Sequence, residues 1–137
     1  MNHKAISYFK WLPLIIWMSL IFYLSHQPSQ SFEFDHSTLW GQIIALLKEY
    51  HLDKLIHASL YFFLGSFCAL AKPGAKLGSL FFCILYGLSD EYHQTFIEGR
   101  FFDLLDLLAD SLGAYFALYL MPLSFNKLKT ALGHSNH

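Results

Sequence analysis

The chain has 137 residues, of which 55% are hydrophobic and only 14% are charged. Soluble domains usually carry about 25% charged residues, so this chain is depleted in charge. The length suits one domain. The formal net charge of -1 argues against a nucleic-acid-binding protein, which would need a basic face.

The first apolar segment is residues 11–24 (WLPLIIWMSLIFYL). A transmembrane helix needs about 20 apolar residues, a length that the segment reaches if it extends past Lys10 and this side chain reaches the interface. A cleaved signal peptide is the alternative, because Lys4 and Lys10 could form its basic region. Residues 23–26 (YLSH) are, however, a poor match to a small-x-small cleavage site. We therefore expect a retained helix that ends before Pro28.

Residues 25–50 form the longest polar region of the chain. Its first half (SHQPSQSFEFDHS) is typical of a loop, whereas its second half repeats apolar residues at i, i+3 and i+4. The second half is too short and too amphipathic to cross a membrane. We expect a short amphipathic helix on the membrane surface, in the first extracytoplasmic loop. A re-entrant turn packed against the bundle is the alternative.

Three further apolar segments follow, and we expect each to span the membrane: residues 52–71, 77–92 and 101–123. Lys72-Pro73-Gly74 predicts a tight connection between the first two of them. The predicted fold is therefore all-α, an integral membrane bundle of four transmembrane helices. It forms a single domain over residues 1–124, and residues 125–137 form a short basic cytoplasmic tail.

The basic residues indicate the orientation. Six of the nine fall on one side of this four-span arrangement: Lys4, Lys10, Lys72, Lys76, Lys127 and Lys129. Loops rich in lysine and arginine stay in the cytoplasm, so both termini are expected there. The sequence thus predicts a multi-pass protein of the plasma (cytoplasmic) membrane.

Polar residues collect at the opposite, outer ends of the spans. They are Asp53, Lys54, His57, Asp90, Glu91, Gln94, Arg100, Asp103, Asp106 and Asp110. An ionisable group at membrane depth costs about 2.5 to 3.5 kcal/mol on insertion scales, which makes such groups candidates for a functional site. Asp103, Asp106, Asp110 and Gly113 follow helical spacing and should share one face. Small residues that continue this face, Ala114 and Ala117, would let another helix approach closely.

Six carboxylates in this set face only two cations, Lys54 and Arg100. Such crowding favours shared protons or a bound cation. The alternative is that the two cations pair with acids only to fix the helix ends. A metal site built from His57, Glu91 and Asp106 is conceivable. Since there is no H-E-x-x-H helix and no Cys/His pair at zinc spacing, we expect neither a metal nor a cofactor.

Three ordered groups of residues resemble the pattern of the VanZ-like membrane proteins: Asp53, Lys54, His57 and Tyr61; Glu91 and Gln94; and Arg100, Asp103, Asp106, Asp110 and Gly113. Residues 17–28 (WMSLIFYLSHQP) also resemble the first helix of that family and its exit. The chain departs from the family pattern at Asp110, where asparagine is expected. The resemblance implies a small polytopic membrane protein of the cell envelope. The named member of the family is linked to resistance to teicoplanin, a glycopeptide antibiotic.

The leading functional hypothesis is a pocket in the outer leaflet that binds a membrane lipid or a lipid-linked envelope precursor by its head group. In a stronger form of the hypothesis the pocket also modifies that head group, with Glu91, Asp106 or Asp110 as general acid or base. The substrate-binding candidates are Asp53, Lys54, His57, Gln94, Arg100 and Asp103. Lys54 and Arg100 would hold an anionic group and Arg100 would contact Asp103 or Asp106.

Two other classes of function stay open. The same carboxylates could serve a small cation- or proton-coupled carrier, or the chain could be a non-catalytic partner of other membrane proteins. The cytoplasmic halves of the spans are almost wholly apolar, which argues against transport through a monomer. Neither catalysis nor an oligomeric state follows from the sequence.

Overall fold

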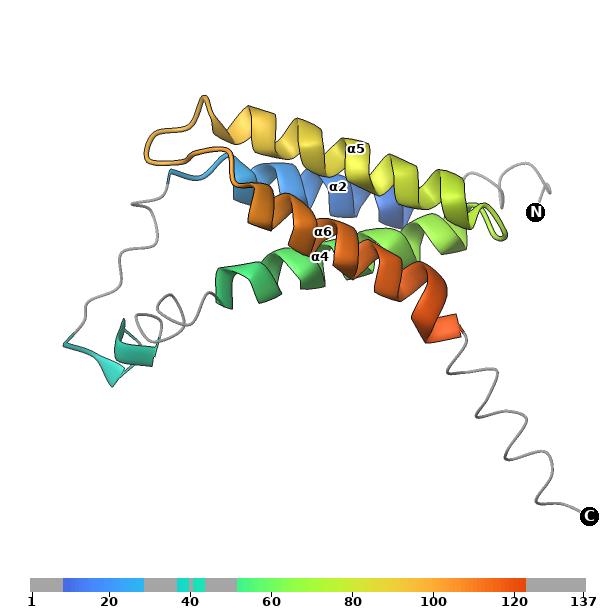
Figure 1. The fold of residues 1–137 in the computed structure, drawn as a ribbon, viewed down its shortest axis with the longest axis horizontal. Coiled ribbons are helices and arrows are strands. Elements are labelled where there is room, and N and C mark those ends of the chain that lie inside the picture. Colours follow the sequence, from blue (N-terminus) through green and yellow to red (C-terminus); the bar gives the residue numbers. More distant parts are fainter. Residues whose placement is uncertain (1–8, 29–36, 40, 44–51, 123–137) are drawn as a thin grey trace, which may run out of the picture.

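The computed structural model describes residues 9–28, 37–39, 41–43 and 52–122. Within these ranges every regular element is a helix, joined by turns and loops, and there is no strand. The elements are α2 (Leu12–Ser25), α4 (Leu52–Ala71), α5 (Lys76–Gln94), α6 (Leu104–Tyr115) and the π-helical η2 (Phe116–Leu120), which continues α6 (Figure 1). The expected all-α architecture is confirmed for these residues. The expected amphipathic helix lies largely outside the described residues, and the basic tail lies wholly outside them.

Four helices pack side by side and alternate in direction. Figure 1 shows that α2 ends, α4 begins, α5 ends and α6 begins at one end of the bundle. The opposite end carries the turn from α4 to α5, where Gly74 has a φ of 87°. A side chain is strained at this φ, so glycine suits the predicted tight connection. This topology brings the polar ends of all four helices together.

The first apolar segment forms a helix within the bundle. Leu14 and Ile21 of α2 are buried. The Trp17 indole Nε1 donates to the Leu60 carbonyl of α4 at 2.8 Å. In return, the Tyr86 hydroxyl of α5 donates to the Met18 carbonyl at 2.7 Å. Two side-chain hydrogen bonds thus attach α2 to both α4 and α5.

Helices α4 and α6 make the closest contact. A Cβ atom placed on Gly113 would lie 2.0 Å from the Ala58 carbonyl oxygen, and one on Gly65 would lie 3.1 Å from the Ala114 Cα. Such distances leave no room for a side chain at Gly113. The small-residue face predicted for the last helix is confirmed, and α4 is the helix that packs against it.

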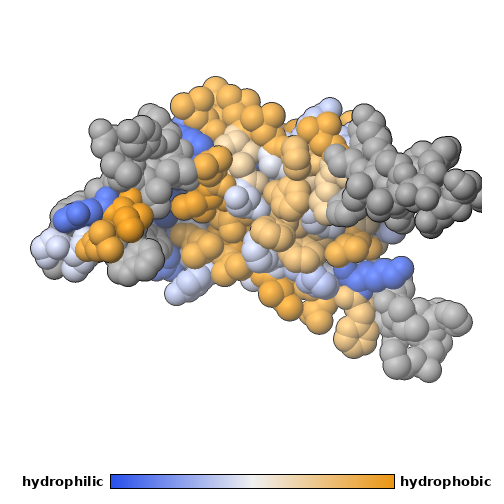
Figure 2. Space-filling view, turned by 90° about the horizontal axis from the view of Figure 1, so that it is seen from below, coloured by the Kyte–Doolittle hydropathy of each residue, from blue (hydrophilic) through white to orange (hydrophobic). Residues whose placement is uncertain are grey.

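The surface of the bundle is strongly apolar. Figure 2 shows hydrophobic side chains over most of the visible helical face. Leucine, isoleucine and phenylalanine side chains are exposed on every helix, among them Ile16, Ile56, Phe81, Leu112 and Phe116. Among the described helices, α4 (over residues 53–71) is both long and apolar enough to cross a membrane, while α2 is apolar but has only 14 residues.

The last helix begins later than the sequence predicts. A span from residue 101 is expected, but α6 starts at Leu104 because Asp103 is its N-cap. Asp103 has extended backbone angles (φ -120°, ψ 112°), and its Oδ1 accepts a hydrogen bond from the Leu105 amide at 2.8 Å. Aspartate is a strong N-cap because it satisfies an amide that has no partner inside the helix. Asp103 therefore does not belong to the helical face of Asp106 and Asp110.

Candidate functional site

Lys54 joins the first turns of α4 and α6. Its Nζ lies 2.5 Å from Asp103 Oδ2, 2.6 Å from Asp106 Oδ1 and 3.3 Å from Asp53 Oδ2. An ammonium group has three hydrogen-bond donors, and three carboxylates surround this one. The structure brings these four predicted site residues together, but they satisfy one another. Lys54 is thus poorly placed to hold an external anion.

The Lys54 ammonium also acts on the titration of Asp103, which lies outside the helices. The hydrogen bond from Lys54 lowers the pKa of the Asp103 carboxyl, and the hydrogen bond from the Leu105 amide lowers this pKa further. Both interactions favour the ionised form of the carboxyl. Asp103 therefore acts as a charged cap of α6 that is paired with α4.

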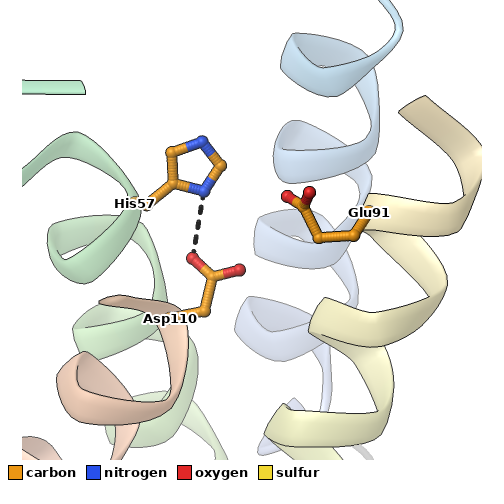
Figure 3. A group of neighbouring side chains, drawn as sticks. All are labelled: His57, Glu91 and Asp110. Carbon is orange, nitrogen blue, oxygen red and sulfur yellow. Dashed lines mark hydrogen bonds and ion pairs between the residues drawn. The ribbon is translucent and has the colours of Figure 1, made fainter. Parts of the chain in front are cut away.

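A second group lies deeper in the bundle and consists of His57, Glu91 and Asp110. His57 Nδ1 lies 3.1 Å from Asp110 Oδ1. Glu91 and Asp110 are fully buried, whereas the His57 side chain keeps 16% of its surface exposed. Figure 3 shows the imidazole and the two carboxyl groups directed toward one another from three different helices. One possible ligand atom from each lies within 4.8 Å of the others.

This deeper group differs from the trio considered from the sequence, in which Asp106 stood in place of Asp110. Asp106 is paired with Lys54, and its Oδ1 lies 3.8 Å from His57 Nε2. Asp110, one turn further into the bundle, makes the shorter contact with His57. Its second oxygen, Oδ2, is buried and has no hydrogen-bond partner among the described residues.

Glu91 connects the end of α5 to the start of α6. Its Oε2 accepts a hydrogen bond from the Asp103 backbone amide at 2.8 Å. Its Oε1 lies 3.4 Å from Gln94 Nε2. Gln94 is buried and is also 3.4 Å from Asp90 Oδ2. The structure therefore brings Glu91 and Gln94, the two site residues predicted on α5, into the polar cluster.

Asp90 and Ser25 form a buried contact that the sequence did not indicate. The Ser25 hydroxyl donates to Asp90 Oδ2 at 2.7 Å and ties α2 to α5. Ser25 was assigned to a loop, but it is the last residue of α2. The sequence signal is its position directly after an apolar run, which places its hydroxyl at the polar end of the bundle.

The predicted contact of Arg100 with an acid is wrong. No carboxylate of a described residue lies within ion-pair distance of it. Its Nε donates to the Gln27 carbonyl at 2.9 Å, Nη1 to Gln94 Oε1 at 3.3 Å, and Nη2 approaches the Leu24 carbonyl at 3.5 Å. The carbonyls at the C-terminal end of a helix lack the usual partner inside the helix and carry partial negative charge, so the end of α2 attracts the guanidinium.

An apolar groove of about 340 Å³ lies between α4 and α6. Leu55, Phe62, Phe63, Leu112 and Phe116 contribute to its walls. It is separate from the polar groups described above, and its lining suits a hydrocarbon chain rather than a head group.

Fold and site together define a small helical bundle with a buried, largely acidic polar cluster at one end. The VanZ/LLP1 family model matches residues 9–125. The chain therefore belongs to this family, as its ordered polar residues suggested. A search of the curated proteins found no match, and a search of the solved structures found none.

Proposed function

We propose that the chain is a four-span protein of the plasma membrane whose polar end binds the anionic head group of a membrane lipid or lipid-linked envelope precursor. The observation that carries this proposal is that the Arg100 guanidinium forms no ion pair with a described residue. Its positive charge lies at the polar end of the bundle with no carboxylate partner among the described residues, whereas the donors of Lys54 are all taken by acids.

Helix lengths support four spans. At 1.5 Å per residue, the 19 residues of α5 extend roughly 28 Å, close to the hydrocarbon thickness of about 30 Å. The 12 residues of α6 and the 5 of η2 form one continuous helix. The shorter α2 would require local thinning of the bilayer or a polar residue reaching the interface. Apolar side chains exposed on all of these helices would then face lipid.

The distribution of lysines supports the orientation. Lys10, Lys72 and Lys76 are exposed and lie at the end of the bundle away from the polar cluster. Because basic loops remain in the cytoplasm, the cluster would open to the outer leaflet. A head group in that leaflet would lie at the same depth as Arg100.

The chemistry of Arg100 favours a phosphate or carboxylate ligand. A guanidinium has five N–H donors in a planar fork that matches these anions. Three of its nitrogens each use one donor in the contacts described, which leaves two donors for a ligand. The apolar groove between α4 and α6 has a lining that suits an acyl chain. This combination favours a lipid over a free anion.

Chemical modification of the head group is the stronger form of the proposal. Asp106 is paired with Lys54. The better candidates for general acid or base are therefore Glu91 and Asp110, together with His57 of α4. If the ligand were a cell-wall precursor, a role in glycopeptide resistance would follow from the same site.

A cation- or proton-coupled carrier is less well supported. Beyond the polar cluster, the buried side chains of the described residues are largely apolar and include Leu64, Cys68, Cys83 and Leu118, with Ser79 as a polar exception. These side chains offer no continuous polar path through one copy of the chain. Glu91 and Asp110 would then form a closed site rather than a passage.

Lipid retention tests the proposal. The full chain, purified in mild detergent, would be incubated with phosphatidylglycerol or phosphatidylcholine and examined by native mass spectrometry. We expect phosphatidylglycerol to be retained preferentially, and Arg100→Gln to weaken this retention about tenfold, equivalent to roughly 1.4 kcal/mol. Lys72→Gln removes a cation at the other end and should have no effect. Equal retention of both lipids, or equal effects of the two substitutions, would contradict the proposal.

A further inference from the structure

His57, Glu91 and Asp110 have the composition of a metal site. They offer one imidazole and two carboxylates, and each group comes from a different helix. Their ligand atoms lie within 4.8 Å of one another. A cation at about 2.1 Å from each ligand in tetrahedral geometry would require separations of roughly 3.4 Å. Shortening the longest of these separations by at most about 1.4 Å would therefore suffice.

A second observation points to a ligand at the same place. Asp110 Oδ2 is buried and makes no hydrogen bond to a described residue, although the residue is fully enclosed. Leaving a buried polar atom unpaired costs about 1 to 3 kcal/mol, and more when the group is charged. Figure 3 shows this second oxygen directed toward the side of Glu91. A bound cation would satisfy it.

Glycine keeps the space beside Asp110 free. A Cβ atom on Gly87 would lie 3.3 Å from Asp110 Oδ2 and 3.4 Å from Tyr61 Cε1. Any side chain at Gly87 would crowd the carboxylate, so this turn of α5, one turn before Glu91, packs beside Asp110 without a side chain.

The charges around the group also favour a cation. Glu91 and Asp110 lie near Asp106 and Asp90, which are buried too. Lys54 contacts Asp106 but neither Glu91 nor Asp110 within ion-pair distance. Two fully buried carboxylates thus have His57 as the nearest group that could balance them.

We propose that His57, Glu91 and Asp110 bind one divalent transition-metal ion such as Zn²⁺ or Mn²⁺. An imidazole ligand favours these ions over Ca²⁺ and Mg²⁺, which prefer all-oxygen sites. The His57 side chain, which is partly exposed, provides the approach for the ion from the surface of the bundle. This site runs against the sequence-based expectation of no metal, because ligands on three separate helices leave no local motif.

The role of the ion rests on the proposed function. Three protein ligands leave a coordination position open, as in catalytic zinc sites. A phosphate or carboxylate of the head group would fill this position, with Arg100 holding the same anion from the rim of the pocket. The metal would then add to the affinity for an anionic lipid.

Metal binding can be measured without any lipid. The full chain in detergent would be stripped with EDTA, dialysed against Zn²⁺, Mn²⁺ or Mg²⁺, and assayed by inductively coupled plasma mass spectrometry. We expect about one Zn²⁺ or Mn²⁺ per chain and no comparable uptake of Mg²⁺. Near-isosteric Glu91→Gln and Asp110→Asn should each weaken the affinity by about 100-fold or more, exceeding the 10- to 100-fold typical of outer-shell changes.

Asp90→Asn is the matched control, because it removes a buried charge from the same end of the bundle without removing a proposed ligand. Metal affinity should fall much less in this variant than in Glu91→Gln or Asp110→Asn, because only a neighbouring charge is lost and not a ligand. The Co²⁺-loaded wild-type chain gives a second measurement, since its visible spectrum should show mixed nitrogen and oxygen ligation. Other histidines in the chain could also bind zinc. If the zinc affinity is unchanged in both Glu91→Gln and Asp110→Asn, the zinc is bound elsewhere and the assignment is wrong.

Failure to take up any of these ions would also overturn the site, and would leave a proton shared by the carboxylates as the explanation of their proximity. The two proposals remain distinguishable. Metal binding without a preference for anionic lipid would reject the head-group function alone, and lipid preference without metal binding would reject the metal site alone.

Discussion

Gly113 of α6 packs so closely on Ala58 of α4 that a Cβ atom on Gly113 would lie 2.0 Å from the Ala58 carbonyl oxygen. Ala58 directly follows His57, and Gly113 comes three residues after Asp110. The crossing of the two helices therefore fixes the distance between the imidazole and the buried carboxylate. Close packing and the geometry of the site depend on the same contact.

Gly113→Ala should destabilise the bundle. The added methyl meets backbone atoms that cannot rotate away, and overpacking of this kind typically costs about 1 to 3 kcal/mol. Unfolding in an SDS titration, followed by circular dichroism, measures the loss. Gly78→Ala is the control, since a Cβ there meets nothing within 4 Å; it should be neutral or stabilising by up to about 1 kcal/mol. Equal stability of the two variants would contradict the close crossing.

Lys54 and Asp106 should show strong energetic coupling. Replacing Lys54 by Met leaves partly buried carboxylates without their cation, and the loss should be about 1.5 to 3 kcal/mol, as for hydrogen bonds to charged groups. In the double variant Lys54→Met/Asp106→Asn the losses should be less than additive by about 1 kcal/mol or more. The same SDS titration measures each corner of the cycle. Strict additivity would mean that the ion pair does not form.

Asp103 should contribute stability that depends on pH. Because its pKa is lowered in the folded chain, its contribution is fully present above the unfolded carboxyl pKa of about 3.9 and is lost as the pH falls through the lower folded value. Asp103→Asn keeps a good N-cap but removes the titration. The difference in unfolding free energy between wild type and this variant should therefore shrink as the pH falls below about 4. A difference that does not vary with pH would exclude the charged cap.

The sequence predicts the helices and their polar ends well, for physical reasons. Apolar runs bounded by polar residues define α2, α4 and α5 within a few residues, and alternation of direction then places the polar ends of the helices together. Gly113 and the alanines after it indicate a close helix contact through their size alone. These properties are local, or follow directly from connectivity.

Loop geometry and helix depth are harder to predict. Helical spacing continues through Asp103, so the pattern does not reveal that this residue is an N-cap in extended conformation. Arg100 is drawn to carbonyls at the end of α2, a contact between residues far apart in the sequence. Whether Asp110 or Asp106 contacts His57 depends on the offset between α6 and α4 along their axes. This offset is set by the packing of the two helices in three dimensions.

The central claim is that the polar cluster lies at the outer face of a membrane-spanning bundle, and site-directed labelling tests it most directly. Glu98 lies in the connection between α5 and α6 at the polar end, and Lys72 lies in the turn at the opposite end; both are exposed. Single cysteines, Glu98→Cys and Lys72→Cys, would be introduced after Cys68 and Cys83 are replaced by alanine. Spheroplasts would then be treated with a membrane-impermeant maleimide. We expect labelling of Glu98→Cys in intact spheroplasts and of Lys72→Cys only after lysis. Labelling of both positions from the same side, or of Lys72→Cys alone in intact spheroplasts, would contradict it.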